Sequence, residues 1–150
     1  MRAVLDDVVE RAVYVQAPFD AVWAALTDPE WHEDWHVAPC QALGHRKGAR
    51  CAWGEDRGAP VITGTVESFR PATGQVSHSF AYTFLDEPES LVEWEVEEHG
   101  RVTSVWLRHH LDGRHRSTRV MVAGGWFLVL SRLKTLVETG KPMALPSEPE

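Results

Sequence analysis

A long amphipathic segment near the C-terminus, residues 117–140, limits the folds open to this chain. Its apolar residues recur at steps of three and four, which places them on one stripe of an α-helix. Ser117 or Thr118 can cap the first turn, and Gly140 with Pro142 ends the helix. A helix over 118–139 is about 33 Å long, so the other segments must form the surface that it covers. The stripe consists of Val122, Trp126, Val129, Leu130, Leu133, Leu136 and Val137.

Gly124 and Gly125 interrupt this helix, although each glycine in a helix interior costs about 0.5–1 kcal/mol relative to alanine. Two explanations remain open. Either the helix packs closely against a strand at this point, or the missing side chains leave room for a ligand between helix and sheet.

Size and charge narrow the class of protein. A chain of 150 residues fits one domain with a real core. It carries 15 Lys and Arg against 22 Asp and Glu, a net charge of −7, which disfavours nucleic acids and anionic membranes as partners. Seven tryptophans favour large aromatic surfaces in a core or pocket.

Location and redox state follow from what the sequence lacks. The start has no apolar signal segment, and no run approaches the ~18 apolar residues of a membrane span, so we expect a cytoplasmic protein. Cys40 and Cys51 show no zinc or disulfide pattern and are expected to be reduced thiols. We expect no cofactor.

The remaining segments predict an α+β domain. Residues 8–16 favour a strand, Pro18 opens a helix with Phe19, Val22, Trp23 and Leu26 on one side, and a second short helix follows Asp28-Pro29. After Pro39 come β-type runs separated by turn residues, which predict an antiparallel meander of about five strands. The predicted strands are 43–46 with 49–54, 61–69, 76–84, 91–98 and 102–110, and residues 141–150 are expected to form a flexible tail after a domain at 1–140.

A two-residue hairpin loop at His99-Gly100 predicts the register of the last two strands. It pairs Glu98 with Arg101, Val96 with Thr103, Trp94 with Val105 and Val92 with Leu107. The two-residue period then turns His109 toward the apolar face. In the preceding strand His78 shares a face with Val76, Phe80, Tyr82 and Phe84, so it also points inward.

The sequence resembles a known superfamily at both ends. V-Y-V-Q-A-P-F-D-A-V-W-A-A-L-T-D-P-E at 13–30, followed by Trp35, resembles the opening of START-like domains of the SRPBCC superfamily. G-W-F-L-V-L-S-R-L-K-T-L-V-E-T-G at 125–140 is similar to the closing helix of homologues of the heat-shock-protein ATPase activator, the AHSA-like branch. G-T-V-E-S-F-R-P at 64–71 and Leu107-Arg108-His109 lie where that branch has comparable strands.

This resemblance implies a helix-grip (START-like, Bet v-type) fold, in which a curved antiparallel sheet of about six strands surrounds the long helix. It also implies an apolar cavity between them, which in various members holds lipids, polyketides, hormones or other small molecules. The namesake of the branch acts through a protein partner. Phe80 stands where the branch often has Trp, so the pocket shape cannot be taken from a relative.

His32-Glu33-Asp34-Trp35-His36 matches the zinc-protease pattern H-E-x-x-H. We interpret it as a chance match, because the helix is short and no third ligand follows at the required spacing. Adventitious metal binding by His32 and His36 is the alternative, and no metal site is predicted.

His78 and His109 are the better candidates for chemistry, as polar groups on an apolar concave face. Either they are buried histidines paired with neighbours, or they orient a ligand or act as acid or base. A basic cluster at the start of the long helix could attract an anion or could be a solvated loop that balances the acidic strand 93–98. The cluster consists of Arg108, His110, Arg114, His115, Arg116 and Arg119.

We therefore expect a cavity that binds a small apolar or amphipathic molecule. The alternatives are a cyclase- or dehydratase-like enzyme using His78 or His109, and a co-chaperone-like domain with exposed aromatic residues at Trp31 and Trp35. A chaperone or another protein, and a second copy of the chain, stay open as partners. The residues expected to line the cavity are Trp53, Val66, His78, Phe80, Tyr82, Trp94, Leu107, His109, Met121, Val122, Gly125 and Trp126.

Overall fold

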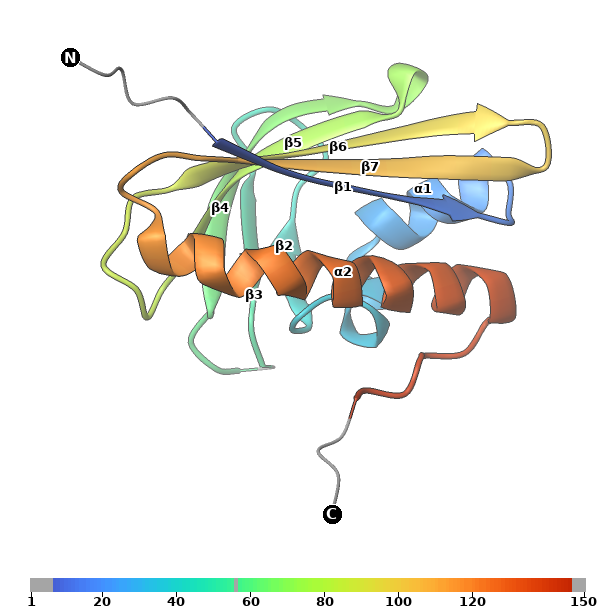
Figure 1. The fold of residues 1–150 in the computed structure, drawn as a ribbon. Coiled ribbons are helices and arrows are strands. Elements are labelled where there is room, and N and C mark those ends of the chain that lie inside the picture. The colour runs from blue at the N-terminus through green and yellow to red at the C-terminus, as the bar shows by residue number, and fades with distance from the viewer. Residues whose placement is uncertain (1–6, 56, 147–150) are drawn as a thin grey trace.

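A computed structural model describes residues 7–55 and 57–146. In this part of the chain a curved antiparallel sheet lies against one long helix, α2, and the short helices follow the first strand (Figure 1). The elements in chain order are β1 (Asp7–Val15), α1 (Phe19–Thr27), η1 (Pro29–Asp34), β2 (Cys40–Leu43), β3 (Arg50–Trp53), β4 (Ile62–Arg70), η2 (Pro71–Thr73), β5 (Gln75–Tyr82), β6 (Ser90–His99), β7 (Val102–Leu111) and α2 (Arg116–Thr139).

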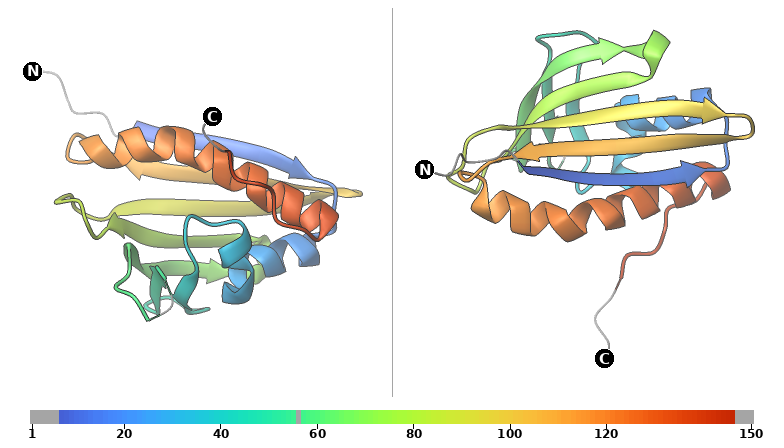
Figure 2. Two further views of the ribbon diagram at one scale, coloured as in Figure 1. Left: turned by 90° about the horizontal axis from the view of Figure 1, so that it is seen from below. Right: turned by 45° about the horizontal axis from the view of Figure 1, so that its top comes forward.

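The described strands form a seven-stranded sheet in the order β1-β7-β6-β5-β4-β3-β2. From β2 to β7 each strand pairs with its sequence neighbour, as short connections between antiparallel strands require. Only the first strand crosses over, because β1 pairs with β7. The sheet bends away from β1 toward β2, and α2 lies along its concave side (Figure 2). This confirms the helix-grip fold, with one strand more than expected.

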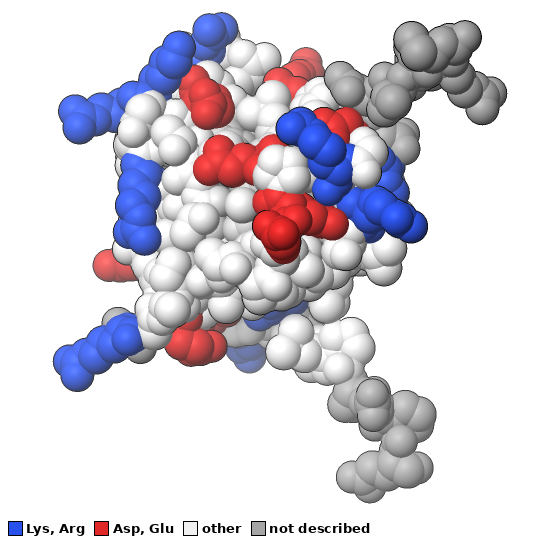
Figure 3. Space-filling model, turned by 90° about the vertical axis from the view of Figure 1, so that its left-hand side faces the viewer, with Lys and Arg blue, Asp and Glu red and all other residues white. Residues whose placement is uncertain are grey.

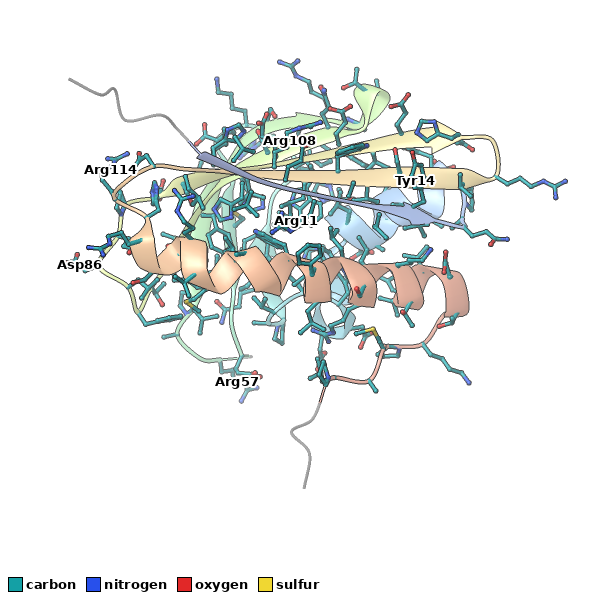
Figure 4. All side chains as sticks on the ribbon, in the orientation of Figure 1. Arg11, Tyr14, Arg57, Asp86, Arg108 and Arg114 are labelled. Carbon is teal, nitrogen blue, oxygen red and sulfur yellow. The ribbon has the colours of Figure 1, made fainter. Side chains whose placement is uncertain are left out.

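Side chains fill the space between the sheet and α2 (Figure 4). Alternate residues of β6 and β7 point toward α2, and Val92, Trp94, Val105 and Leu107 are all buried. From the other side, the predicted apolar stripe of α2 supplies Val122, Trp126, Val129, Leu130, Leu133 and Leu136 as buried residues.

The hairpin register differs from the prediction by two residues. His99 pairs with Val102, so the loop is Gly100-Arg101 and Trp94 pairs with Leu107. Gly100 has φ +69°, the left-handed conformation that a two-residue hairpin turn requires at its first position and that glycine adopts without strain. Since a shift of two leaves every side chain on its face, His109 is still buried.

Two strand boundaries were also predicted wrongly. β2 covers Cys40–Leu43 rather than 43–46, because the reversal around Lys47 and Gly48 begins at Gly44. The predicted strand 76–84 corresponds to β5, which ends at Tyr82. A turn closed by the hydrogen bond from Leu85 N–H to Tyr82 O carries Phe84 outward, where its side chain is 60% exposed.

The N-terminus of α2 is capped from another segment. The Glu87 carboxylate, in the β5–β6 loop, accepts hydrogen bonds from Ser117 N, Thr118 N and Thr118 Oγ at 2.8, 2.9 and 2.7 Å. Neither Ser117 nor Thr118 acts as the cap, because the helix begins at Arg116 and both residues lie inside its first turn. A carboxylate here satisfies free backbone N–H groups and complements the helix dipole.

Arg11 joins β1 to the middle of α2, where Figure 4 labels it. Its Nη2 donates to Ala123 O at 2.9 Å, and its guanidinium lies 4.2 Å from the centroid of the Phe127 ring. Gly124 and Gly125 adjoin this contact, yet a Cβ added at either would meet nothing within 4 Å. The close-packing explanation for these glycines is therefore wrong, and both leave open space.

By length and hydropathy, 24 residues and 1.5, α2 could cross a membrane, contrary to our reading that no run comes close. Core helices of soluble proteins share this length and hydropathy. Here the buried stripe of α2 packs on the sheet. After Gly140 the chain has neither helix nor strand up to residue 146, and residues 147–150 of the predicted tail lie outside the described residues.

Candidate functional site

An inner cavity of about 20 Å³ lies between α1, η1 and the concave face of the sheet. A cavity of this size holds about one water molecule. Its walls are almost entirely apolar and aromatic, and the polar groups among them are histidines and one threonine. The lining residues are Leu26, Thr27, His32, Trp35, His36, Leu43, Trp53, Phe69, Val76, His78 and Trp94.

His32 is a structural residue in this wall. Its Nδ1 accepts a hydrogen bond from Trp53 Nε1 at 2.9 Å, so its proton is on Nε2, which donates to Leu26 O at 2.8 Å. Burial lowers the pKa of His32 to about 4. Both ring nitrogens are thus occupied, and the described residues contain no group of three or more His, Cys, Asp or Glu that could hold a metal. The H-E-x-x-H pattern places His32 and His36 in the interior rather than on a metal-binding surface.

His36 lies at the centre of an aromatic cluster. Its ring stacks on Trp53 with centroids 4.8 Å apart and meets Trp126 edge-on at 6.1 Å. The Val37 N–H donates to its Nδ1 at 2.9 Å, and Arg132 Nη1 donates to its backbone carbonyl at 2.7 Å. Burial holds the pKa of His36 well below its ordinary value, so the ring is neutral with its proton on Nε2.

His78 carries its ring proton on the other nitrogen than His36 does. Its Nδ1 lies 2.9 Å from Ser79 O, and because a carbonyl only accepts, Nδ1 carries the proton and Nε2 is an acceptor. Burial lowers the pKa of His78 to about 4. Its ring packs against Trp53 at 5.2 Å, so Trp53 contacts both His36 and His78.

A second, outer cavity of about 10 Å³ lies between β5, α2 and the segment after η1. His36 lines this cavity as well as the inner one, so the two cavities adjoin at this residue. Gly125 contributes to the α2 side of the outer cavity, where its missing side chain leaves space. The lining residues are His36, Val37, Phe80, Tyr82, Val122, Gly125, Trp126 and Val129.

His109 is fully paired beneath these cavities. Trp126 Nε1 donates to its Nδ1 at 3.1 Å, which places the ring proton on Nε2, 2.6 Å from Ser90 Oγ. The Ser90 hydroxyl in turn donates to Phe80 O at 3.2 Å. Burial lowers the pKa of His109 to about 3. This chain of hydrogen bonds joins α2, β7, β6 and β5, so His109 holds these four elements in place relative to one another.

Comparison with protein families agrees with this architecture. Residues 16–138 match the family described as activator of Hsp90 ATPase homolog 1-like protein, AHSA1. The chain belongs to this family. A comparison with curated proteins gave no significant match.

Solved structures of similar shape extend the AHSA1 comparison. DynU16, a protein in the dynemicin biosynthetic locus, is 27% identical with a TM-score of 0.77 over 91% of this chain, and this chain spans 49% of DynU16. CalU16 from Micromonospora echinospora is 24% identical, with a TM-score of 0.70 over 95% of this chain and 88% of CalU16. The Aha1 dimer from Colwellia psychrerythraea is 17% identical, with a TM-score of 0.74 over 90% of this chain and 98% of the other. The last two likenesses show the fold alone.

The residues expected to line a cavity separate into four groups in this AHSA1-family domain. Trp53, His78 and Trp94 line the inner cavity. A second group lies deeper, since Val66, Leu107 and His109 are buried without lining either space. Met121 is 41% exposed and lies on a surface depression with Glu87. Phe80, Tyr82, Val122, Gly125 and Trp126 line the outer cavity.

The basic cluster does not form one site in the AHSA1-family domain. Arg108 pairs with Glu10 at 2.8 Å, and His110 pairs with Glu93. Arg114 pairs with Asp112 at 2.7 Å. For His115 the solvated-loop alternative does not hold. It is buried, its Nδ1 accepts from Asp112 N, and its Nε2 lies within hydrogen-bonding distance of Pro88 O and Glu89 O.

The lining residues that the sequence did not predict include Trp35 and His36. Trp35 is fully buried and donates from Nε1 to Ala25 O, whereas only Trp31 of the predicted surface pair is exposed, at 41%. His36 was considered only within the zinc pattern. The spacing H-E-D-W-H carries a usable signal, because Glu33 and Asp34 mark the more exposed side, whereas His32, Trp35 and His36 turn inward.

Proposed function

We propose that this protein binds a small, largely apolar molecule between the concave face of the sheet and α2. The observation that carries the proposal is the pair of aromatic cavities on the two sides of His36, next to the open space at Gly125. Ligand sites are typically concave and apolar with a few convergent polar groups. The resemblance to DynU16 supports a role with a small molecule.

Binding requires the cavities to open, because each holds about one water molecule at its present size. The outer cavity is the side from which a ligand would enter, since Val37 beside it is exposed. Figure 3 shows the end of the molecule at which α2 begins, and a broad part of it carries no charged side chain. Phe84 and Met121, from the β5–β6 loop and the first turns of α2, contribute exposed apolar surface.

The experiment uses two glycines that differ in position but not in helix propensity. Gly125→Leu places a side chain at the outer cavity, and Gly124→Leu serves as the matched control. We expect the affinity for N-phenyl-1-naphthylamine, followed by fluorescence, to fall at least tenfold in Gly125→Leu and to change little in Gly124→Leu. Equal affinities in all three proteins, or no binding to the wild type, would contradict the proposal. Native mass spectrometry of protein from its own source would then show whether a ligand is retained.

An acid–base enzyme of the cyclase or dehydratase type is a second candidate, because Nε2 of His78 has no partner among the described residues. Its pKa near 4 makes it a weak base at neutral pH. His109 is less suited, since both its nitrogens are engaged. His78→Phe would abolish turnover of a substrate while leaving the fold intact.

A co-chaperone-like role has less support, because Trp35 is buried and leaves Trp31 alone as the exposed aromatic of that pair. Capture of a chaperone by the wild type and its loss in Trp31→Ala would favour it over ligand binding. We also propose that the protein is cytoplasmic, in keeping with its family and its acidic net charge.

A further inference from the structure

Two histidines in the wall of the inner cavity each keep one ring nitrogen that the rest of the described fold does not use. Nε2–H of His36 has no acceptor among the described residues, and Nε2 of His78 has no donor there. Neither nitrogen belongs to the fully enclosed unpaired atoms of the described residues, which are Nε of Arg11 and Nε of Arg132. Both histidines line the same cavity. A molecule in that cavity therefore contacts both rings, and protein atoms do not seal off either free nitrogen.

The two histidines are held in these states by backbone groups on different elements. Val37 N–H fixes Nδ1 of His36 as an acceptor, and Ser79 O fixes Nδ1 of His78 as a donor. Trp53 packs against both rings, at 4.8 and 5.2 Å, and restricts their orientation. The result is a preorganised pair of opposite polarity.

We propose that this pair recognises the hydroxyl group of a hydroxyaromatic molecule, with His36 donating to the hydroxyl oxygen and His78 accepting its proton in a hydrogen bond. This inference rests on the ligand-binding function proposed above. A hydroxyl group both donates and accepts, which matches one free N–H and one free nitrogen lone pair. The indole rings of Trp35, Trp53 and Trp94 supply flat walls for the aromatic part.

The cavity disfavours a carboxylate in the same position. No Lys or Arg belongs to its lining, and the imidazoles of His32, His36 and His78 are neutral. An anion there would lose its hydration without gaining a counter-charge, whereas a neutral hydroxyl loses only hydrogen bonds that the histidines replace. The chemistry of the site thus selects a neutral phenol.

Calorimetric titration with three bicyclic probes tests the assignment. 2-Naphthol carries the hydroxyl, 2-methylnaphthalene has a methyl group of similar size in its place, and 2-naphthoate carries a carboxylate. We expect wild type to bind 2-naphthol about tenfold more tightly than 2-methylnaphthalene, because the methyl compound leaves the two buried histidine nitrogens unpaired. 2-Naphthoate should bind more weakly than 2-naphthol.

The variants separate this inference from the proposed function. In His78→Phe the tenfold preference for 2-naphthol should disappear while 2-methylnaphthalene still binds, and His78→Gln, which keeps an acceptor, should restore part of it. One outcome would overturn the inference and leave the ligand-binding function standing. In it, all probes bind the wild type and lose affinity in Gly125→Leu, but 2-naphthol binds no more tightly than 2-methylnaphthalene. A preference for 2-naphthoate would also overturn it. Absence of binding by every probe would contradict both, and the wild-type series decides even if His78→Phe does not fold.

Discussion

Acid should destabilise this protein already above the pH at which its carboxylates titrate, because of its buried histidines. Burial lowers the pKa of His32 and His78 to about 4 and that of His109 to about 3, against 6.5 for the ordinary side chain. Below pH 6.5 the unfolded chain therefore binds protons that the folded chain does not. Stability is complete above pH 6.5 and falls as the pH decreases toward 4.

The size of the effect follows from these pKa differences. At pH 5 each of the three histidines should lower the free energy of unfolding by about 2 kcal/mol, or about 6 kcal/mol together. A domain of ordinary stability has about 5–15 kcal/mol in total. His36, whose pKa is lowered in the same direction, adds to this loss. We therefore expect marginal stability near pH 5.

Urea unfolding followed by tryptophan fluorescence between pH 8 and pH 5 measures this dependence. Near pH 5 the free energy of unfolding should change by about 1 kcal/mol per pH unit for each of the three histidines. In His78→Gln the slope should decrease by about that amount. The denaturant dependence, m, should stay constant over the range, which checks that the same two states are compared. A free energy of unfolding that stays flat from pH 7 to pH 5 would refute the reasoning.

Four further substitutions test single sites by chemical denaturation. Ser90→Ala removes the acceptor of the buried His109 Nε2–H and should cost about 1–3 kcal/mol, and a loss below 0.5 kcal/mol would mean that the ring finds another partner. Glu87→Gln weakens the cap of α2 and should cost about 1 kcal/mol at pH 7. Desolvation raises the pKa of the Glu87 carboxyl, but the hydrogen bonds that its carboxylate accepts outweigh this and lower the pKa. The difference in free energy of unfolding between Glu87→Gln and wild type should therefore shrink below pH 4.5. Gly64→Ala should destabilise by more than about 3 kcal/mol, since its Cβ would lie 1.8 Å from a β5 carbonyl oxygen. Gly124→Ala should stabilise by about 0.5–1 kcal/mol, and equal effects at the two glycines would contradict the packing described.

The sequence sufficed for the fold because the fold depends on local periodicity. The three- and four-residue spacing of α2 and the alternation in β6 and β7 each appear within one segment. The hairpin error of two residues was avoidable, because Gly100 is the residue suited to the first loop position and placing His99 there ignored this. The error did not change which face of the sheet each side chain was expected to occupy, since the side-chain period of a strand is two.

The site was less accessible to prediction because its contacts join distant segments. His36 meets Trp53 and Trp126 through the packing of η1 against β3 and α2, and no local pattern encodes these pairs. Periodicity identified His78 and His109 as inward-facing, but not which of them keeps a free nitrogen. That difference depends on partners such as Ser90, whose position relative to His109 follows from strand register.

The position of β1 at the edge of the sheet affects how the chain can fold during synthesis. Val15 pairs with Thr103, 88 positions later, and the rest of β1 pairs with residues still further along. At a translation rate of about 5–20 residues per second, the first strand leaves the ribosome several seconds before β7 exists. During that interval its apolar side chains are exposed, and the charges of Glu10 and Arg11 oppose pairing with other nascent chains. The sheet can therefore be completed only after β7 has been made.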